Sequence, residues 1–97
     1  MWILESDDSA SDRATFRMAT GSVKTIGRST GAEFQLDAPL VSRLHCQLSA
    51  TDETIEVKDL DSTNGTFVNG RRITSARLQP GDRLRVGPVE LRISRTD

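Results

Sequence analysis

The sequence has few of the residues that cross-link small domains or hold a metal in them. Its 97 residues include one cysteine, Cys46, and one histidine, His45. A single cysteine cannot form an internal disulfide, and two soft ligands are too few to close a structural zinc site. The composition therefore excludes disulfide scaffolds and zinc modules, and we expect neither a metal nor another cofactor.

Long apolar runs are also missing. No stretch approaches the roughly 18 apolar residues of a membrane-spanning helix. Residues 1–12 are acidic, whereas a signal peptide begins with basic residues and continues with apolar ones. We therefore expect a soluble protein with no membrane partner, located in the cytoplasm or, in a eukaryotic cell, also in the nucleus.

Aromatic residues are scarce, and the four that are present are Trp2, Phe16, Phe34 and Phe67. The core must therefore be mostly aliphatic. A chain of 97 residues is also too short for a second core, because chains divide into several domains only above roughly 250 residues. Residues 1–97 are expected to form a single domain.

The net charge of −1 conceals an uneven distribution, because residues 1–12 carry four acids and no base. The last third of the chain contains seven arginines: Arg71, Arg72, Arg77, Arg83, Arg85, Arg92 and Arg95. This density suggests a nucleic-acid face. However, Arg85 and Arg92 alternate with apolar residues, as solvent-facing strand positions do, and no aromatic residues are interleaved with them to stack on bases. We therefore expect no nucleic-acid partner.

The clearest sequence period is two, which is typical of half-buried strands. Apolar and polar residues alternate in four segments: Leu44–Leu48, Ile55–Lys58, Leu84–Val86 and Val89–Ile93. Turn-forming residues separate such segments so closely that no window is long enough for a helix. The chain is therefore expected to be all-β, a two-sheet antiparallel β-sandwich of about 10–11 short strands.

Two local patterns add detail to this expectation. Asn69-Gly70, between Phe67 and Ile73, predicts a tight hairpin, because Asn-Gly accepts the positive φ angles of a type I′ turn. Residues 5–12, with the sequence ESDDSASD, predict a mobile acidic loop. This loop would join a first strand near residues 2–4 to a second strand near residues 15–18.

Three polar clusters fall outside the alternating segments, and loops on a rigid sandwich are where binding groups concentrate. The clusters are Gly27-Arg28-Ser29-Thr30-Gly31, Val41-Ser42-Arg43-Leu44-His45 and Asp61-Ser62-Thr63-Asn64-Gly65-Thr66. Each cluster alone fits an ordinary turn, in which short hydroxyl and amide side chains bond to nearby backbone. Only the combination of the three clusters distinguishes a binding site from ordinary turns.

Taken together, the clusters resemble the pattern of the forkhead-associated (FHA) domain over almost the whole chain. The family pattern is Gly-Arg, then Ser-x-x-His, then Asn-Gly, which here are Gly27-Arg28, Ser42 to His45 and Asn64-Gly65. The flanking segments agree as well, namely Phe34–Asp37, Asp59–Leu60, Thr66–Gly70 and Leu78–Asp82. The resemblance implies a small β-sandwich that binds phosphothreonine.

The residue types at these positions suit a phosphate ligand. A phosphate dianion presents three acceptor oxygens, whose partners are arginine forks, hydroxyls and backbone N–H groups. Arg28, Ser42, Arg43 and Thr63 supply such donors. The resemblance implies that Arg28 and Ser42 contact the phosphate and that Arg43 and Thr63 line the pocket. It also implies that Asn64 bonds to the backbone of the bound peptide.

Three other residues are expected to support the site. The resemblance implies that His45 braces the loops through hydrogen bonds and does not touch the ligand. Gly27 and Gly65 are expected to meet backbone requirements that a side chain would violate.

A catalytic interpretation is disfavoured by geometry. His45 and Cys46 have the chemistry of a base and a nucleophile. They are neighbours on a predicted strand, however, where successive side chains point to opposite faces. The sequence therefore predicts a protein that is not an enzyme.

Two further motif matches are incomplete. Asp59-x-Asp61-x-Thr63 begins like a calcium-binding loop but lacks the glycine and the glutamate that such a loop needs further on. The segment 65–70 has the glycine spacing of a P-loop, but Arg71-Arg72 follow where lysine and Ser/Thr are required. Neither a calcium site nor a nucleotide site is expected.

The sequence thus predicts a monomeric phosphothreonine-dependent module that acts as a signalling adaptor downstream of a Ser/Thr kinase. The alternative is the same sandwich serving as a structural or dimerising domain without phosphate dependence. The complete set of Arg28, Ser42 and Asn64 favours the first interpretation, because a scaffold has no need of a phosphate pocket.

Overall fold

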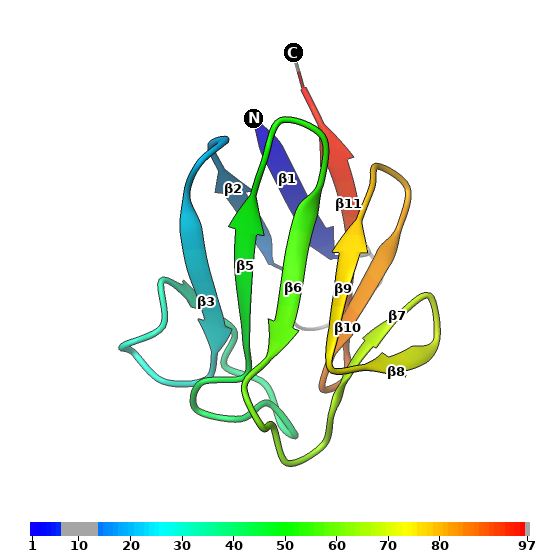
Figure 1. The fold of residues 1–97 in the computed structure, drawn as a ribbon. Coiled ribbons are helices and arrows are strands. Elements are labelled where there is room, and N and C mark those ends of the chain that lie inside the picture. The colour runs from blue at the N-terminus through cyan, green and yellow to red at the C-terminus, as the bar shows by residue number, and fades with distance from the viewer. Residues whose placement is uncertain (7–13, 97) are drawn as a thin grey trace.

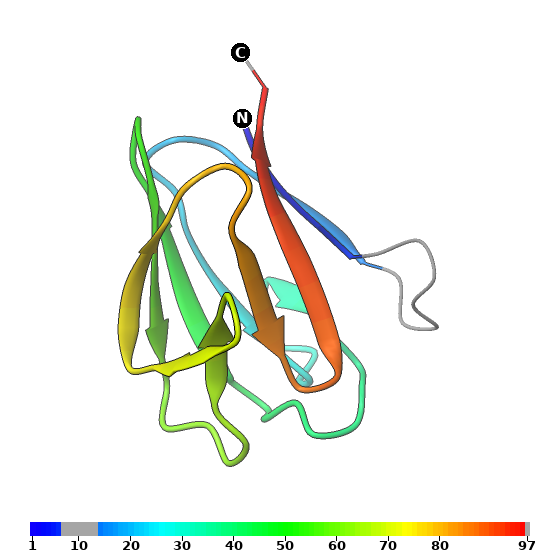
Figure 2. The ribbon, with the colours of Figure 1, turned by 90° about the vertical axis from the view of Figure 1, so that its right-hand side faces the viewer.

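A computed structural model of the chain describes residues 1–6 and 14–96, which contain eleven strands in two sheets. The six-stranded sheet, in the order β2-β1-β11-β10-β7-β8, consists of β1 (Trp2–Ser6), β2 (Thr15–Met18), β7 (Thr66–Val68), β8 (Arg71–Ile73), β10 (Arg83–Val86) and β11 (Val89–Arg95). The five-stranded sheet, in the order β4-β3-β5-β6-β9, consists of β3 (Val23–Gly27), β4 (Phe34–Gln35), β5 (Cys46–Ala50), β6 (Ile55–Asp59) and β9 (Ser75–Leu78). The sheets face each other as two layers (Figure 2), which confirms the predicted sandwich.

The core between the sheets is mostly aliphatic and is built from alternate strand residues. In β11, Val89, Leu91 and Ile93 are buried, whereas Glu90 and Arg92 are exposed. Full burial of one such aliphatic side chain contributes about 1.5–3 kcal/mol of hydrophobic stabilisation. A slip of one residue would turn the whole buried set toward solvent, so the alternation fixes the register of the strand.

Trp2 connects the two layers. Its side chain on β1 is fully buried, and its indole N–H donates a hydrogen bond of 3.0 Å to the carbonyl oxygen of Thr51, which follows β5 in the other sheet. Burial of a large ring is favourable only when its polar atom finds such a partner. The guanidinium of Arg95 lies 5.2 Å from the centre of the ring.

The first strand is longer than the sequence predicts. β1 continues through Glu5 and Ser6, which pair with Arg92 and Leu91 of β11, so these two positions do not belong to the acidic loop expected at residues 5–12. Ser6 is buried, and its hydroxyl oxygen accepts a hydrogen bond of 2.7 Å from the backbone N–H of Ala14. Residues 7–12 of the expected loop lie outside the described residues.

The second strand and the hairpin lie where the sequence predicts them. β2 is Thr15–Met18, and β7 pairs with β8 across Asn69 and Gly70, whose φ angles are 50° and 84°. The eleven strands agree with the expected number of about 10–11, but the sequence analysis did not locate β3, β4 and β9. β4 also pairs parallel to β3, the one parallel pair among the described strands.

The two ends of the sandwich differ in what they carry. Both termini lie at one end, where the backbone N–H of Thr96 donates to the carbonyl oxygen of Met1 at 2.9 Å. The loops that follow β3, precede β5 and join β6 to β7 lie together at the opposite end (Figure 1). Within residues 1–6 and 14–96, no helix has the length and apolar character needed to cross a membrane.

Candidate functional site

Three loops enclose a pocket at the end away from the termini. It is lined by Arg28, Leu40, Val41, Ser42, Arg43, Leu44, Asp61, Thr63 and Asn64. The five residues expected to contact a ligand are therefore brought together, although they come from three separate stretches of sequence. Two arginines and one aspartate give the lining a net positive charge.

Arg28 is fixed where β3 ends. Its backbone N–H donates to the carbonyl oxygen of Ser42 at 2.9 Å, and its Nε–H donates to the carbonyl oxygen of Val41 at 3.1 Å. A guanidinium has five N–H donors, so this side-chain bond orients the group and leaves its terminal NH₂ groups to bind an anion. The preceding residue must be glycine, because a Cβ at Gly27 would overlap the carbonyl oxygen of Arg43.

Ser42 joins two of the loops. Its hydroxyl oxygen accepts a hydrogen bond of 3.0 Å from the backbone N–H of Thr63. A hydroxyl that accepts in this way still has its own hydrogen to donate. The arrangement therefore aims one O–H donor into a pocket that already holds two guanidinium groups, those of Arg28 and Arg43.

Asn64 makes a second connection between the same two loops. Its Nδ2 donates to the carbonyl oxygen of Leu40 at 3.1 Å, which sets the orientation of the amide. The amide oxygen can then accept a hydrogen bond from a donor such as a peptide N–H. Leu40 itself has a φ angle of 70°, which is uncommon for a bulky residue.

His45 braces the two loops from beneath the pocket. It is fully buried; its Nδ1 accepts a hydrogen bond of 3.0 Å from the backbone N–H of Ser42, and its Nε2 lies 2.9 Å from the carbonyl oxygen of Gly65. A ring nitrogen that accepts from an N–H must carry a lone pair, so the tautomer with hydrogen on Nε2 satisfies both contacts. Loop bracing is the role that the resemblance implies for His45.

The strand that follows His45 begins at Cys46, two residues later than the predicted alternating segment Leu44–Leu48. His45, which precedes the strand, and Cys46 are both buried, whereas Leu44, expected to face the core, is 51% exposed. Burial raises the pKa of the Cys46 thiol to about 12, with the charge of Asp59 as a second cause. The thiol therefore stays protonated at neutral pH and is a poor nucleophile.

A carboxylate that the sequence analysis did not assign to the site, that of Asp59, holds the third loop. Asp59, at the end of β6, accepts hydrogen bonds from the backbone N–H of Ser62 at 3.1 Å and from the hydroxyl of Thr66 at 2.7 Å. The Ser62 hydroxyl also donates to Asp59 and accepts from the N–H of Gly65. Partial burial raises the pKa of Asp59, but the hydrogen bonds from Ser62 and Thr66 outweigh it and hold the pKa below its usual value.

The second glycine expected to support the site also has a geometric requirement. Gly65 has a φ angle of 90°, in the region that disfavours other residues. A Cβ at this position would lie 2.8 Å from Nε of Arg72. Four lining residues were not predicted as site residues, namely Leu40, Val41, Leu44 and Asp61.

The chain matches a protein family and several curated proteins. The family model, described as FHA domain, matches residues 24–87. The chain is 38% identical over 79 residues to the ABC transporter ATP-binding/permease protein Rv1747 of Mycobacterium tuberculosis, an alignment that covers 81% of this chain and 9% of that protein. The chain spans less than half the length of the curated relatives that it matches.

Solved structures match along nearly the entire chain. One, from a study of phosphothreonine-dependent FHA domain interactions, has a TM-score of 0.86 and 31% identity, and the match covers 99% of this chain and 97% of the other. Another is the FHA domain of FhaA in complex with the intracellular domain of Rv3910, with a TM-score of 0.83, 32% identity and coverage of 96% and 99%.

Proposed function

The chain belongs to the FHA domain family, and from this premise we propose that it binds a phosphothreonine-bearing segment of another protein in the pocket lined by Arg28, Ser42 and Asn64. The FHA domain is a phosphothreonine-binding module and not an enzyme. The chain therefore serves as an adaptor that joins its partner only after a Ser/Thr kinase has acted.

The observation that carries this proposal is the convergence of three kinds of donor and acceptor in one pocket. The guanidinium of Arg28, fixed at Nε, suits two oxygens of a phosphate, and the hydroxyl of Ser42 suits a third. The amide of Asn64 is oriented by Leu40 and stands ready for the backbone next to the phosphothreonine. Arg43 and Thr63 also line the pocket. Arg43 adds a second positive charge, and Thr63 belongs to the loop whose backbone N–H bonds to the Ser42 hydroxyl.

The phosphate-independent alternative is less well supported. A structural or dimerising domain would gain nothing from two arginines placed in one pocket, because like charges close together raise the free energy of the folded state. The solved FHA domain from the study of phosphothreonine-dependent interactions, 31% identical to this chain, supports a phosphate ligand. We further propose that the chain acts as a monomer and without a cofactor.

Titration of matched peptides tests the proposal. A peptide selected from an oriented phosphothreonine library is compared with its unphosphorylated form and with the phosphoserine form by fluorescence anisotropy. We expect binding of the phosphothreonine peptide, weaker binding of the phosphoserine peptide and no saturable binding of the unphosphorylated one. Burial of the threonine methyl alone contributes about 0.8 kcal/mol, or some fourfold in affinity. Equal affinity for the phosphorylated and unphosphorylated peptides would establish the phosphate-independent alternative.

A further inference from the structure

The outer face of the six-stranded sheet carries a cluster of cations that the proposed function does not use. Register places Arg83 opposite Arg92, Arg85 opposite Phe67, and Phe67 opposite Arg72 across four neighbouring strands, β11, β10, β7 and β8. Directly opposed residues of an antiparallel pair project from the same side of the sheet. These five residues, Phe67, Arg72, Arg83, Arg85 and Arg92, are called the arginine face below.

The arginine face carries more cations than carboxylates, because register sets Glu5 opposite Arg92 and Glu90 opposite Arg85, which leaves four arginines against two glutamates. Among residues 1–6 and 14–96 there are two side-chain ion pairs, Arg83 with Glu90 at 2.8 Å and Arg77 with Glu56 at 4.0 Å. Only one arginine of the face is thus neutralised by a carboxylate in contact with it. The four arginines lie on neighbouring strands and outnumber the two glutamates, so the net positive charge of the face favours an incoming anion.

The arrangement is held in place by an aromatic ring. The guanidinium carbon of Arg85 lies 4.0 Å from the centre of the half-buried Phe67 ring. The planar guanidinium stacks well on such a ring and keeps its edge N–H groups for carboxylates. Because the ring limits the motion of Arg85, binding costs less side-chain entropy than it would for a freely moving lysine.

The arginine face adjoins the pocket. Nε of Arg72 and a ring carbon of Phe67 both lie close to Gly65, at 2.8 and 3.3 Å from the position that a Cβ would occupy. Gly65 directly follows Asn64, which lines the pocket. A partner whose phosphothreonine sits in the pocket therefore has a continuous surface on which a neighbouring segment can lie.

The chemistry of this surface favours an acidic protein segment over a nucleic acid. Its one aromatic ring is covered by Arg85 and is not available to stack on a base. Glu90 on β11 and Glu5 on β1 lie among these arginines, and the net charge of the whole chain is −1, which opposes long-range attraction of a polyanion. Short, dispersed carboxylates match the spacing of the arginines better than a continuous phosphate backbone does.

We propose that the arginine face binds an acidic segment of the same protein whose phosphothreonine occupies the pocket. The proposal rests on the proposed function, since the phosphothreonine brings the acidic segment to this face. The two contacts act together, because binding at the pocket raises the effective concentration of the tethered segment at the arginine face.

The test compares three phosphothreonine peptides on the same protein. One is a short peptide, and the other two are the same peptide extended through a Gly-Ser linker by six glutamates, at the amino end in one and at the carboxyl end in the other. We expect one of the extended peptides to bind about threefold to tenfold more tightly than the short one, as two or three exposed ion pairs contribute together. The gain should shrink as salt is raised.

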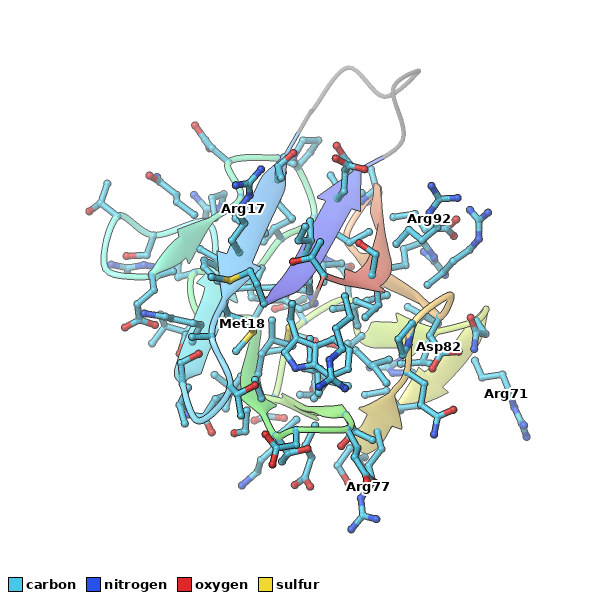
Figure 3. All side chains as sticks on the ribbon, turned by 90° about the horizontal axis from the view of Figure 1, so that it is seen from above. Arg17, Met18, Arg71, Arg77, Asp82 and Arg92 are labelled. Atoms are coloured by element: carbon cyan, nitrogen blue, oxygen red, sulfur yellow. The ribbon has the colours of Figure 1, made fainter. Side chains whose placement is uncertain are left out.

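Charge-neutralising variants show which arginines produce the gain in affinity of the extended peptide. In Arg85→Gln/Arg92→Gln the ratio of the two affinities should fall to about one, and Arg72→Gln should reduce it in part. Arg77→Gln is the matched control, because Arg77 lies on β9 of the other sheet and projects from a different side of the molecule than Arg92 (Figure 3). Each ratio is taken on a single variant, so any change in the pocket itself cancels.

Three outcomes would overturn the inference: no gain with either extension, a gain that persists in the double variant, or a gain that Arg77→Gln removes equally. Preferential binding of a single-stranded oligonucleotide that competes with the extended peptide would instead assign the face to nucleic acid. Failure of the proposed function is distinguishable from all of these, because the short peptide would then bind equally with and without its phosphate.

Discussion

Arg28 is the residue on which the proposed recognition of phosphate depends most. Replacement by alanine removes a charge-assisted contact worth about 1.5–3 kcal/mol, so we expect a 10- to 150-fold loss of phosphopeptide affinity. Because the Arg28 side chain makes one hydrogen bond within the described part of the chain, the fold should survive. Titration of the phosphothreonine peptide, together with a thermal melt, measures both effects.

Arg77→Ala is the control for that measurement. Its side chain is 78% exposed on β9, away from the pocket, and the substitution removes the same charge. It should leave the affinity within a factor of two or so, since exposed pairs such as Arg77 with Glu56 contribute little. An Arg28→Ala protein that binds as well as Arg77→Ala would show that the phosphate lies elsewhere.

His45 and Ser42 are hydrogen-bonded to each other, but replacing His45 should mainly lower stability, whereas replacing Ser42 should mainly weaken peptide binding. His45→Ala leaves the N–H of Ser42 and the buried carbonyl of Gly65 without their partner, so we expect a loss of about 2 kcal/mol or more in the free energy of unfolding. Ser42→Ala removes an exposed contact to Thr63 and should weaken peptide binding while the melting temperature hardly changes. Equal melting temperatures for the two variants would contradict the bracing role of His45.

Asp59 couples the third loop to pH. Since its pKa is lowered in the folded state, its contribution is present above the unfolded pKa, near 4, and is lost as the pH falls through the folded pKa. We therefore expect the difference in unfolding free energy between the wild type and Asp59→Asn to shrink between pH 6 and pH 3. Denaturant titrations at several pH values measure it, and a difference that grows on acidification would contradict the assignment.

At the scale of elements, the β7–β8 hairpin depends on its turn. Gly70 has a φ angle of 84° and open space around it, so Gly70→Ala introduces backbone strain of about 1–2 kcal/mol without any clash. For a domain of this size that strain lowers the melting temperature by roughly 4–8 °C per kcal/mol. Gly31→Ala is the matched control, because Gly31 lacks a positive φ and has only ordinary contacts; a similar loss there would refute the strain argument.

Elements with a clear local signal were predictable from sequence. The period-two strands and the Asn69-Gly70 turn are encoded by side chains a few residues apart, and the sandwich follows from them. β4 and β9 were not located, because β4 has two residues and is defined by its partner β3, and β9 has only four residues, of which Leu78 is the one large apolar residue. The late start of β5 follows from His45, whose backbone N–H bonds to Ile26 while its ring turns inward to the loops.

The pocket was predictable only in part. The resemblance identified positions such as Arg28 and Asn64, because their residue types and order are distinctive. Leu40 could not be found in this way, since its place in the lining depends on a left-handed backbone and a bond to Asn64 that only the folded loops show. Asp59 had a local signal that was interpreted as an incomplete calcium motif, namely a carboxylate followed three residues later by Ser62, whose backbone N–H it accepts. Its bond to Thr66, seven residues on, has no such local signal.

At the scale of the whole molecule, the two ends of the sandwich separate the pocket from the termini. Sequence attached at either terminus would leave from the end away from the pocket, so fusion there should not change the affinity for a phosphopeptide. An attachment inside the pocket loops, by contrast, would disturb bonds such as that between Asn64 and Leu40.

The pairing of the first strand with the last also determines how the molecule responds to mechanical force. β1 and β11 are antiparallel, and Trp2 lies opposite Arg95, so both free ends leave from the same end of the pair. Tension applied between the termini therefore loads the hydrogen bonds one after another, as in unzipping. A handle at Pro88, at the other end of β11, would instead load all of them at once in shear. Single-molecule pulling should then give a clearly lower rupture force from the two termini than from Met1 and residue 88, and the buried Cys46 thiol would not compete for the attachment chemistry.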